Sequence, residues 1–260
     1  MSDIEFEIDK GVAVLKLNRP ESLNSFTDEM HIEVSGALTQ AAQDKSVRAV
    51  LITGNGRGFC AGQDLSAVAS PGDGETDLGV IVGKYYNPLV RLITTMEKPV
   101  ICAVNGVAAG AGANLAFACD IVIAARQASF IESFSKLGLI PDTGGTWILP
   151  RLVGMARAKG LAMLGSKITA EQALAWGMIW QVVDGDKLME TSMSLARELA
   201  TQPTRGFALT KQAFAASTVN SLDQQLELEK ELMRAAGKTH DYQEGVTAFL
   251  EKRPPVYQGE

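Results

Sequence analysis

The segment Val100-Ile-Cys-Ala-Val-Asn-Gly-Val-Ala-Ala-Gly-Ala-Gly-Ala-Asn114 joins a short apolar run to a glycine-rich turn. A near-continuous apolar run of this length predicts a strand buried on both faces, and the turn leads into an apolar helix over residues 110–118. Two similar runs, Ala49–Thr53 and Ile121–Ala125, flank it along the chain. Because helical segments such as Tyr85–Met96 alternate with these strands, the sequence predicts an α/β core with parallel pairing.

Towards the N-terminus, residues 4–17 alternate between apolar and polar side chains around Asp9-Lys-Gly11, which predicts a β-hairpin. A helical pattern then covers residues 28–44. Towards the C-terminus, Thr169-Ala-Glu-Gln172 and Ser221-Leu-Asp-Gln224 are typical capping boxes of helices. Only helices are predicted from Thr201 onward. We therefore expect a core over residues 1–200 and a helical region over 201–260 that docks on the core or on another subunit.

Composition excludes several classes of function. The chain has 260 residues, 46% hydrophobic and 21% charged, and 24 basic against 30 acidic residues leave a net charge of −6. Nothing in this balance attracts nucleic acid or an anionic membrane. The first residues lack the pattern of a signal peptide, and the longest apolar stretch is broken by glycines, so a cytoplasmic protein without a membrane span is expected. The three cysteines predict free thiols in a reducing compartment.

The sequence lacks the residue patterns that several kinds of chemistry require. The two histidines, His31 and His240, stand alone and are predicted to be surface helix residues, so no metal site is expected. The sequence contains no Gly-x-Ser-x-Gly elbow and no Walker A motif. The turn Gly110-Ala-Gly112 begins like a dinucleotide fingerprint, but Leu115 stands where the third glycine is required.

Two glycine-rich segments and one aspartate are the remaining candidates. Gly54-Asn-Gly-Arg-Gly-Phe-Cys-Ala-Gly-Gln-Asp64 and the turn before Asn114 each follow a predicted buried strand. Their backbone N–H groups could converge on an oxyanion, or the glycines could only permit tight turns. Asp142, in Gly138-Leu-Ile-Pro-Asp-Thr-Gly-Gly-Thr146, is either a helix N-cap or a buried carboxylate with a raised pKa that acts as an acid/base.

Six motifs occur in an order and spacing that are highly specific together. They are Leu17-Asn-Arg-Pro20 with Asn24, Gly58-Phe-Cys-Ala-Gly-Gln-Asp64, Val104-Asn-Gly106, Ala109-Gly-Ala-Gly-Ala-Asn114, Cys119-Asp-Ile-Val122 and Ile140-Pro-Asp-Thr-Gly-Gly-Thr146. Through them nearly the whole chain resembles the crotonase, or enoyl-CoA hydratase/isomerase, superfamily. The resemblance implies a spiral of ββα turns with a helical C-terminal region that forms homotrimers, commonly paired into hexamers.

The resemblance also assigns a site. It implies that the backbone N–H groups of Gln63 and Ala111 form an oxyanion hole for a thioester oxygen, and that coenzyme A enters as part of the substrate, with no separate cofactor. Arg57, Phe249 and Lys252 would contact the coenzyme A, although Arg57 and Lys252 could equally be ordinary solvated charges. The remaining residues expected to bind the substrate are Cys60, Ala61, Asp64, Leu65, Tyr86, Gly110, Asn114, Phe134 and Pro141.

Departures from the family pattern favour isomerisation over hydration. Hydratases of the superfamily use two glutamates, and the matching positions carry Asn114 and Phe134, neither of which can take a proton from water. Glu132 could replace them if it shared a strand face with Phe134. Asp142 stands where isomerases of the superfamily keep their acid/base carboxylate. One carboxylate above an enolate is enough to move a proton between two carbons.

Within the superfamily, Tyr86–Arg91, Phe134–Asp142 and Trp176–Asp184 most resemble the isomerases of phenylacetate degradation. The leading hypothesis is therefore an isomerase of a ring-derived or β,γ-unsaturated acyl-CoA. The alternatives are an enoyl-CoA hydratase and a non-catalytic subunit that binds coenzyme A. The aromatic residues Tyr85, Tyr86, Phe134 and Trp147 could line a wide pocket or belong to the core. The composition of residues 66–76 predicts a mobile loop beside this pocket.

Overall fold

The strands of this protein form two sheets, and the chain passes repeatedly from one to the other. The structure is a computed structural model that describes residues 2–68 and 77–260. In these residues the larger sheet has the order β1-β2-β3-β5-β7-β10 and the smaller one β4-β6-β8-β9. The larger sheet consists of β1 (Ile4–Asp9), β2 (Val12–Leu17), β3 (Ala49–Gly54), β5 (Val100–Val104), β7 (Ile121–Ala125) and β10 (Gln181–Val183). The smaller sheet consists of β4 (Gly58–Cys60), β6 (Val107–Ala109), β8 (Ser129–Ile131) and β9 (Lys167–Thr169).

The succession of strands confirms the spiral of ββα turns. Each of β3, β5 and β7 of the larger sheet is followed within a few residues by β4, β6 or β8 of the smaller one, and helical segments precede the next strand. From β2 to β10 the larger sheet is parallel, whereas β1 and β2 form the predicted antiparallel hairpin. Its turn places both Lys10 and Gly11 at positive φ, as a tight hairpin turn requires.

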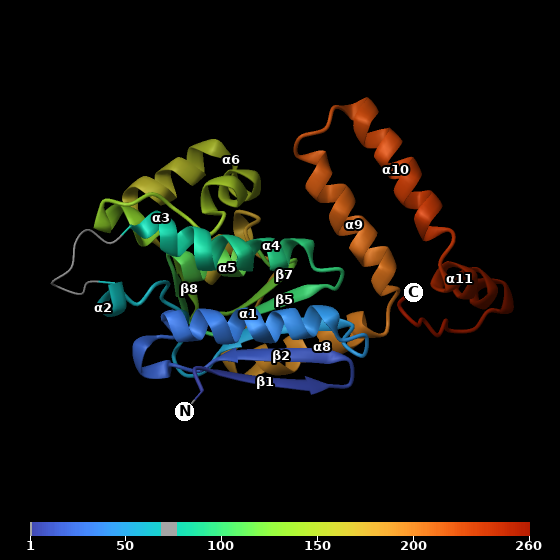
Figure 1. Ribbon diagram of the computed structural model, residues 1–260, viewed down its shortest axis with the longest axis horizontal. Coiled ribbons are helices and arrows are strands. Elements are labelled where there is room, and N and C mark those ends of the chain that lie inside the picture. The colour runs from blue at the N-terminus through green and yellow to red at the C-terminus, as the bar shows by residue number, and fades with distance from the viewer. Residues whose placement is uncertain (1, 69–76) are drawn as a thin grey trace.

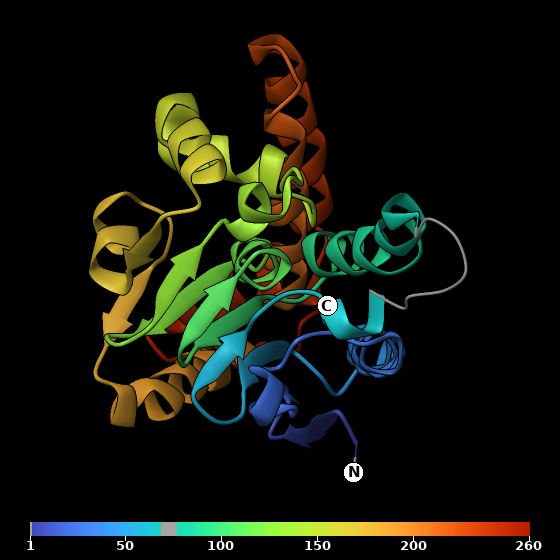
Figure 2. The ribbon, with the colours of Figure 1, turned by 90° about the vertical axis from the view of Figure 1, so that its left-hand side faces the viewer.

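Helices cover both sheets (Figure 1, Figure 2). The helix α8 packs on β2, β3, β5 and β7 of the larger sheet, and α5 packs on β4 and β6 of the smaller one. The α-helices up to α8 are α1 (Asp28–Gln43), α2 (Leu65–Val68), α3 (Leu78–Ile81), α4 (Asn87–Thr95), α5 (Ala111–Phe117), α6 (Gly145–Leu164), α7 (Ala170–Ala175) and α8 (Leu188–Ala200). Short helices of other types are η1 (Pro20–Ser22), the π-helix η2 (Val82–Tyr86), η3 (Ser133–Leu137) and η4 (Gly185–Lys187).

The buried strands explain why the core lies where it does. All residues of β3 and β5 are buried, which is the burial that their unbroken apolar runs predict. The three cysteines are also buried and free, which confirms the prediction of free thiols. Within residues 2–68 and 77–260, no helix combines the length and the apolar composition that crossing a bilayer requires.

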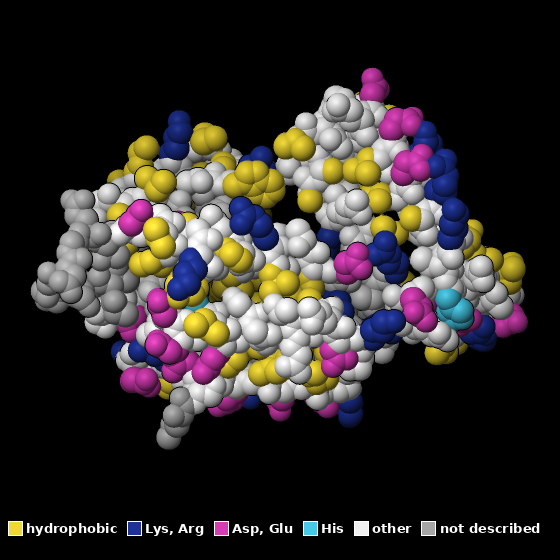
Figure 3. All heavy atoms as spheres, in the orientation of Figure 1, with side chains coloured by type: hydrophobic (Ala, Val, Ile, Leu, Met, Phe, Trp, Pro, Cys, Tyr) yellow, Lys and Arg dark blue, Asp and Glu magenta, His cyan; other side chains and the backbone are white. Residues whose placement is uncertain are grey.

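From Thr204 onward the chain forms α9 (Thr204–Ser217), α10 (Leu222–Ala236) and α11 (His240–Glu251). Ser221 begins α10 with the predicted capping box. In Figure 1 these helices form an arm beside the core, and Figure 3 shows hydrophobic side chains on its surface. Of the loop predicted over residues 66–76, residues 69–76 lie outside the described residues, and residues 65–68 form α2.

Candidate active site

The two glycine-rich segments meet at the ends of neighbouring parallel strands, β4 and β6. A Cβ atom on Gly62, whose φ is +91°, would lie 3.1 Å from the carbonyl oxygen of Ala109 and 3.3 Å from the nitrogen of Ala111. A Cβ on Gly112 would lie 2.2 Å from the carbonyl oxygen of Cys60. Glycine is therefore required at both positions, because a side chain would push the two backbones apart.

This contact places two free N–H groups beside each other. Gln63 directly follows Gly62, and Ala111 is the first residue of α5, where the helix supplies no acceptor. Among the described residues, neither the N–H of Gln63 nor that of Ala111 donates a hydrogen bond. Both residues line the same pocket. The pair can therefore receive an oxygen atom that becomes negative during a reaction.

The side chain of Gln63 is held by two aromatic residues. Its Oε1 atom accepts from the Tyr86 hydroxyl at 2.9 Å and contacts Nε2 of His31 at 3.2 Å. Because Oε1 can only accept, Nε2 must carry the hydrogen. His31 is fully buried and stacks on Tyr85 at a centroid distance of 4.7 Å. Its pKa is lowered, mainly by burial, which keeps the ring neutral.

The sequence-based prediction for His31 was therefore wrong. We expected a surface helix residue, but α1 turns His31 inward between the tyrosines and Gln63. The tyrosines reach it from η2, a π-helix at the start of the helical segment that was expected over Tyr85–Met96. Both tyrosines are buried there. A π-helical turn changes which successive side chains face the core, and no local periodicity predicts it.

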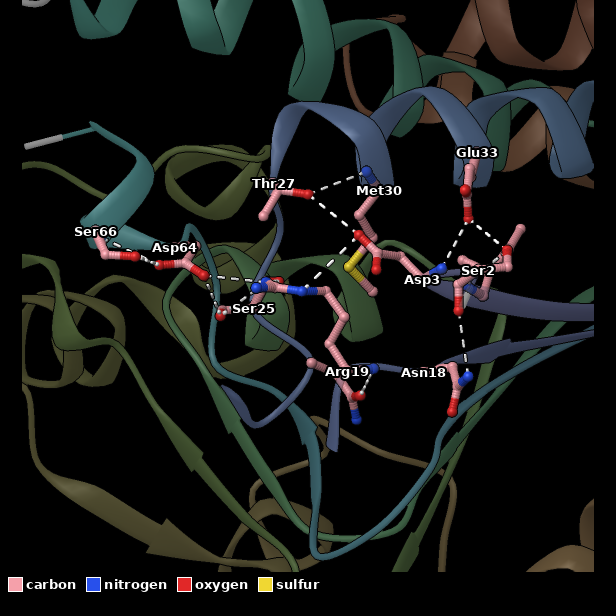
Figure 4. A network of polar contacts seen from close by, with 12 residues as sticks. Ser2, Asp3, Asn18, Arg19, Ser25, Thr27, Met30, Glu33, Asp64 and Ser66 are labelled. Carbon is pink, nitrogen blue, oxygen red and sulfur yellow. Dashed lines mark hydrogen bonds and ion pairs between the residues drawn. The ribbon is translucent and has the colours of Figure 1, made fainter. Parts of the chain in front are cut away.

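Asp64, the residue after Gln63, anchors the first glycine-rich segment to the N-terminal part of the chain (Figure 4). Its carboxylate accepts from Nη1 of Arg19 at 3.0 Å and from the Ser66 hydroxyl at 2.6 Å. Hydrogen bonding to Ser66 is the largest effect on its pKa, which lies below its usual value. Arg19 also donates to the carbonyl oxygen of Ser25 at 2.5 Å. These charge-assisted bonds hold the turn that carries Gln63.

Asp142 lines the same pocket and belongs to the loop between η3 and α6. Burial is the main cause that raises its pKa, and a hydrogen bond from the Thr143 hydroxyl at 2.8 Å opposes the increase. The alternative of a helix N-cap was wrong, because α6 begins at Gly145 with Gly144 as N-cap. The Asp142 carboxylate is therefore free for another task, in an environment that favours its protonation more than water does.

The pocket has a volume of about 450 Å³, and most of its lining is apolar. It contains eight of the predicted residues: Ala61, Gln63, Leu65, Tyr86, Gly110, Ala111, Phe134 and Asp142. Gly62 and Leu139, from the two segments quoted from the sequence, also line it, and the lining residues that the sequence did not indicate are Leu78, Ile81, Val82, Ser133 and Leu137. Leu78, Ile81 and Val82 come from the start of a helical segment whose position over the pocket depends on tertiary packing.

Four other predicted residues do not line this pocket. Cys60 is buried behind the first glycine-rich turn, and Asp64 is tied to Arg19. Asn114 is also buried, and Pro141 is half-buried beside Asp142. Of the aromatic residues, Tyr86 and Phe134 line the pocket, whereas Tyr85 and Trp147 do not.

The residues expected to contact coenzyme A are dispersed in the single chain. Arg57 is exposed on the turn between β3 and β4. Phe249, 81% exposed, belongs to α11, and Lys252 follows the end of that helix. In Figure 1 α11 lies at the opposite end of the molecule from α2 and α3, which border the pocket. One chain alone therefore does not bring Phe249 and Lys252 to Asp142.

Glu132 does not meet the condition under which it could replace the hydratase glutamates. It would have to share a strand face with Phe134, but β8 ends at Ile131 and Glu132 is the N-cap of η3. Its side chain does not line the pocket; it contacts Asn114 in the interior. Asp142 is the only carboxylate among the described residues that line the pocket, so these residues provide one proton carrier.

Comparison with known proteins adds independent findings. Residues 7–260 match the enoyl-CoA hydratase/isomerase family. The 1,2-epoxyphenylacetyl-CoA isomerase of Escherichia coli (strain K12) is 58% identical over 260 residues, with 100% of this chain and 99% of that protein covered. A probable enoyl-CoA hydratase of Rhodobacter capsulatus is 46% identical, with 98% of each covered. The solved structure of an enoyl-CoA hydratase from Bacillus anthracis matches with a TM-score of 0.93 at 35% identity, covering 99% of this chain and 100% of that one.

Proposed function

The chain belongs to the enoyl-CoA hydratase/isomerase family, and from this premise we propose that it is an acyl-CoA isomerase. Its proposed reaction converts ring-1,2-epoxyphenylacetyl-CoA to oxepin-CoA, and the same site would shift the double bond of a 3-enoyl-CoA. The substrate is suggested by the relative from Escherichia coli that is named for the epoxide. The observation that carries the proposal is Asp142, the single carboxylate among the described lining residues, in the same pocket as two N–H groups that have no acceptor among the described residues.

The proposed chemistry follows from these groups. The thioester oxygen accepts hydrogen bonds from the N–H groups of Gln63 and Ala111, which stabilise the negative charge of an enolate. Asp142 removes a proton from the carbon next to the thioester. In a 3-enoyl-CoA the double bond then moves one position, and Asp142 returns the proton to the far carbon. Burial raises the pKa of Asp142 and so strengthens it as a base for the first step.

Two replacements in the structure support isomerisation over hydration. Water needs a base before it can attack a double bond, and family hydratases supply it from positions that are Asn114 and Phe134 here. The amide of Asn114 is buried, and Phe134 presents a ring to the pocket. Glu132 cannot stand in for them because it lies outside the pocket lining. Apolar walls from Leu78, Ile81 and neighbouring side chains suit a carbon ring.

We further propose that residues 1–200 form the catalytic core and residues 201–260 a helical region that joins copies of the chain into a trimer, or a hexamer of two trimers. Large apolar side chains support this, because exposed apolar surface is a common mark of subunit contact. In the arm they include Phe214, Leu222, Met233, Phe249 and Leu250, each at least 71% exposed. In such an assembly Phe249 and Lys252 could meet a coenzyme A bound to a neighbour.

The central experiment replaces Asp142 with asparagine. The variant should lose about 10³-fold in turnover of the epoxide and of a 3-enoyl-CoA, because general acid–base catalysis is removed, and should still bind the thioester. Asp186→Asn, which changes an exposed carboxylate remote from the pocket, is the matched control. Wild-type turnover by the Asp142 variant would refute the assignment.

A substrate panel separates the alternatives. Rapid loss of the conjugated absorbance of crotonyl-CoA would favour a hydratase. A protein that binds the thioesters but does not exchange their α-protons with deuterated solvent would be a non-catalytic binding subunit. Isomerisation of the epoxide or of the 3-enoyl-CoA, with slow or no hydration of crotonyl-CoA, is the expected pattern.

A further inference from the structure

A second carboxyl group lies directly behind the wall of the pocket. Glu132 is 3% exposed, and its Oε2 atom is 3.4 Å from Nδ2 of Asn114. Its other oxygen, Oε1, is buried and has no hydrogen-bond partner among the described residues, and the same holds for Oδ1 of Asn114. Buried polar atoms are nearly always paired, so two orphaned acceptors on touching side chains need an explanation.

The orientation of the Asn114 amide is determined by its other neighbour. Nδ2 donates to the carbonyl oxygen of Asp142 at 3.0 Å, and this oxygen also accepts from the N–H of Gly145 at 2.8 Å. Exchanging the nitrogen and oxygen of the amide would direct Oδ1 at that carbonyl, where two acceptors would meet. Asn114 therefore connects the Glu132 carboxyl to the backbone of Asp142.

We propose that Glu132 is held in its neutral, protonated form and acts as a positioning residue. Its O–H donates to Oδ1 of Asn114 and so keeps the Asn114 amide against Asp142. One proton then gives partners to both orphaned acceptors, because the acid oxygen becomes a donor and Oδ1 receives it. The role of Glu132 in turnover rests on the proposed isomerase function. Its protonation does not depend on that function.

The charges around Glu132 favour the neutral form. Burial is the main cause that raises the pKa of Glu132 to about 7, the negative charge of Asp142 raises it further, and the hydrogen bond from Asn114 opposes both. No salt bridge reaches Glu132 among the described residues. The charged residues on the elements packed around it, all exposed, are Lys136 of η3, Lys167 of β9, Glu171 of α7, and Arg151, Arg157 and Lys159 of α6.

Ionisation of Glu132 would remove the arrangement. A carboxylate cannot donate to Oδ1, so Oδ1 of Asn114 and Oε1 of Glu132 would both be left without a donor in a buried space, and the Asn114 amide would lose one of the bonds that hold it against Asp142. Turnover should therefore decrease as the pH rises through the pKa of Glu132. This alkaline decrease would originate from a residue that touches neither the substrate nor the oxyanion.

Two substitutions distinguish this role from a merely structural one. Glutamine at position 132 supplies a permanent N–H donor and an acceptor, so Glu132→Gln should keep turnover level where that of the wild type falls. Glu132→Ala removes the donor at every pH and should lower kcat about tenfold with little change in KM, as expected for the loss of one buried hydrogen bond. Glu29→Gln, on the exposed face of α1, is the matched control and should retain the alkaline decrease.

The protonation state can be measured without any substrate. The infrared spectrum of the wild type at about pH 6 should contain the carbonyl stretch of a protonated carboxylic acid that is absent from Glu132→Gln and that disappears above the pKa of the group. If the two spectra do not differ in this band, the proposal is wrong. If the band is present but Glu132→Gln retains the alkaline decrease, Glu132 does not position Asp142. If no variant turns over the epoxide or a 3-enoyl-CoA, the proposed function fails, and the infrared result still decides whether Glu132 is protonated.

Discussion

Replacing Glu132 with glutamine should change how the stability of the protein depends on pH. The pKa of Glu132 in the folded protein is about 7, against 4.5 for an unperturbed glutamate. Because the pKa is raised by folding, its contribution to stability is fully present below pH 4.5 and is lost as the pH rises through 7. Each pH unit between the two values corresponds to about 1.4 kcal/mol, so the wild type should lose about 3 kcal/mol in all.

Urea unfolding followed by circular dichroism measures this loss. The free energy of unfolding is obtained at several values between about pH 5 and about pH 8.5, at equal protein concentration, for the wild type and for Glu132→Gln. All other titrating groups are shared, so their effects cancel in the difference between the two proteins. The free energy of unfolding of Glu132→Gln minus that of the wild type should increase by about 2.5 kcal/mol from the low to the high end of this pH range.

Glu29→Gln serves as the control, because Glu29 is exposed on α1. Its difference from the wild type should stay nearly constant with pH. A constant difference for Glu132→Gln as well would refute the reasoning, since it would mean that Glu132 titrates alike in the folded and unfolded chains. The shift is large enough to measure because Glu132 is only 3% exposed and solvent screens it little.

Two further predictions concern the glycine-rich turns that carry the N–H groups of Gln63 and Ala111. Gly112→Ala should destabilise the fold by about 3 kcal/mol and lower the midpoint of thermal unfolding, because its Cβ would lie 2.2 Å from the carbonyl oxygen of Cys60. The control is Gly36→Ala in the open interior of α1, which should leave this midpoint equal or higher. Tyr86→Phe removes a donor to Gln63 and should lower kcat about tenfold while thermal unfolding changes little. An unchanged kcat would mean that Gln63 keeps its place without Tyr86.

The sequence alone determined the fold and the outline of the candidate site. Apolar runs such as Val100–Val104 are long enough to specify buried strands locally, and the structure contains them nearly as predicted. Glycine-rich turns after these strands indicated where backbone N–H groups become accessible. Asn114 and Phe134 were decisive because residue identity itself excludes a base. Such inferences succeed where the physical cause lies in the residue or in its immediate neighbours along the chain.

Only the tertiary structure decided which side chains meet. His31 reads as a surface residue along its helix, yet Tyr85, Tyr86 and Gln63 enclose it from distant parts of the chain. For Glu132 the sequence left open a strand face shared with Phe134, and the structure places it instead at the N-cap of η3, in contact with Asn114. In both cases the burial and the resulting pKa arise from long-range packing, which determines how much water and which partners each group meets. The charge that a residue carries at neutral pH is therefore a property of the fold, even where its identity is plain from the sequence.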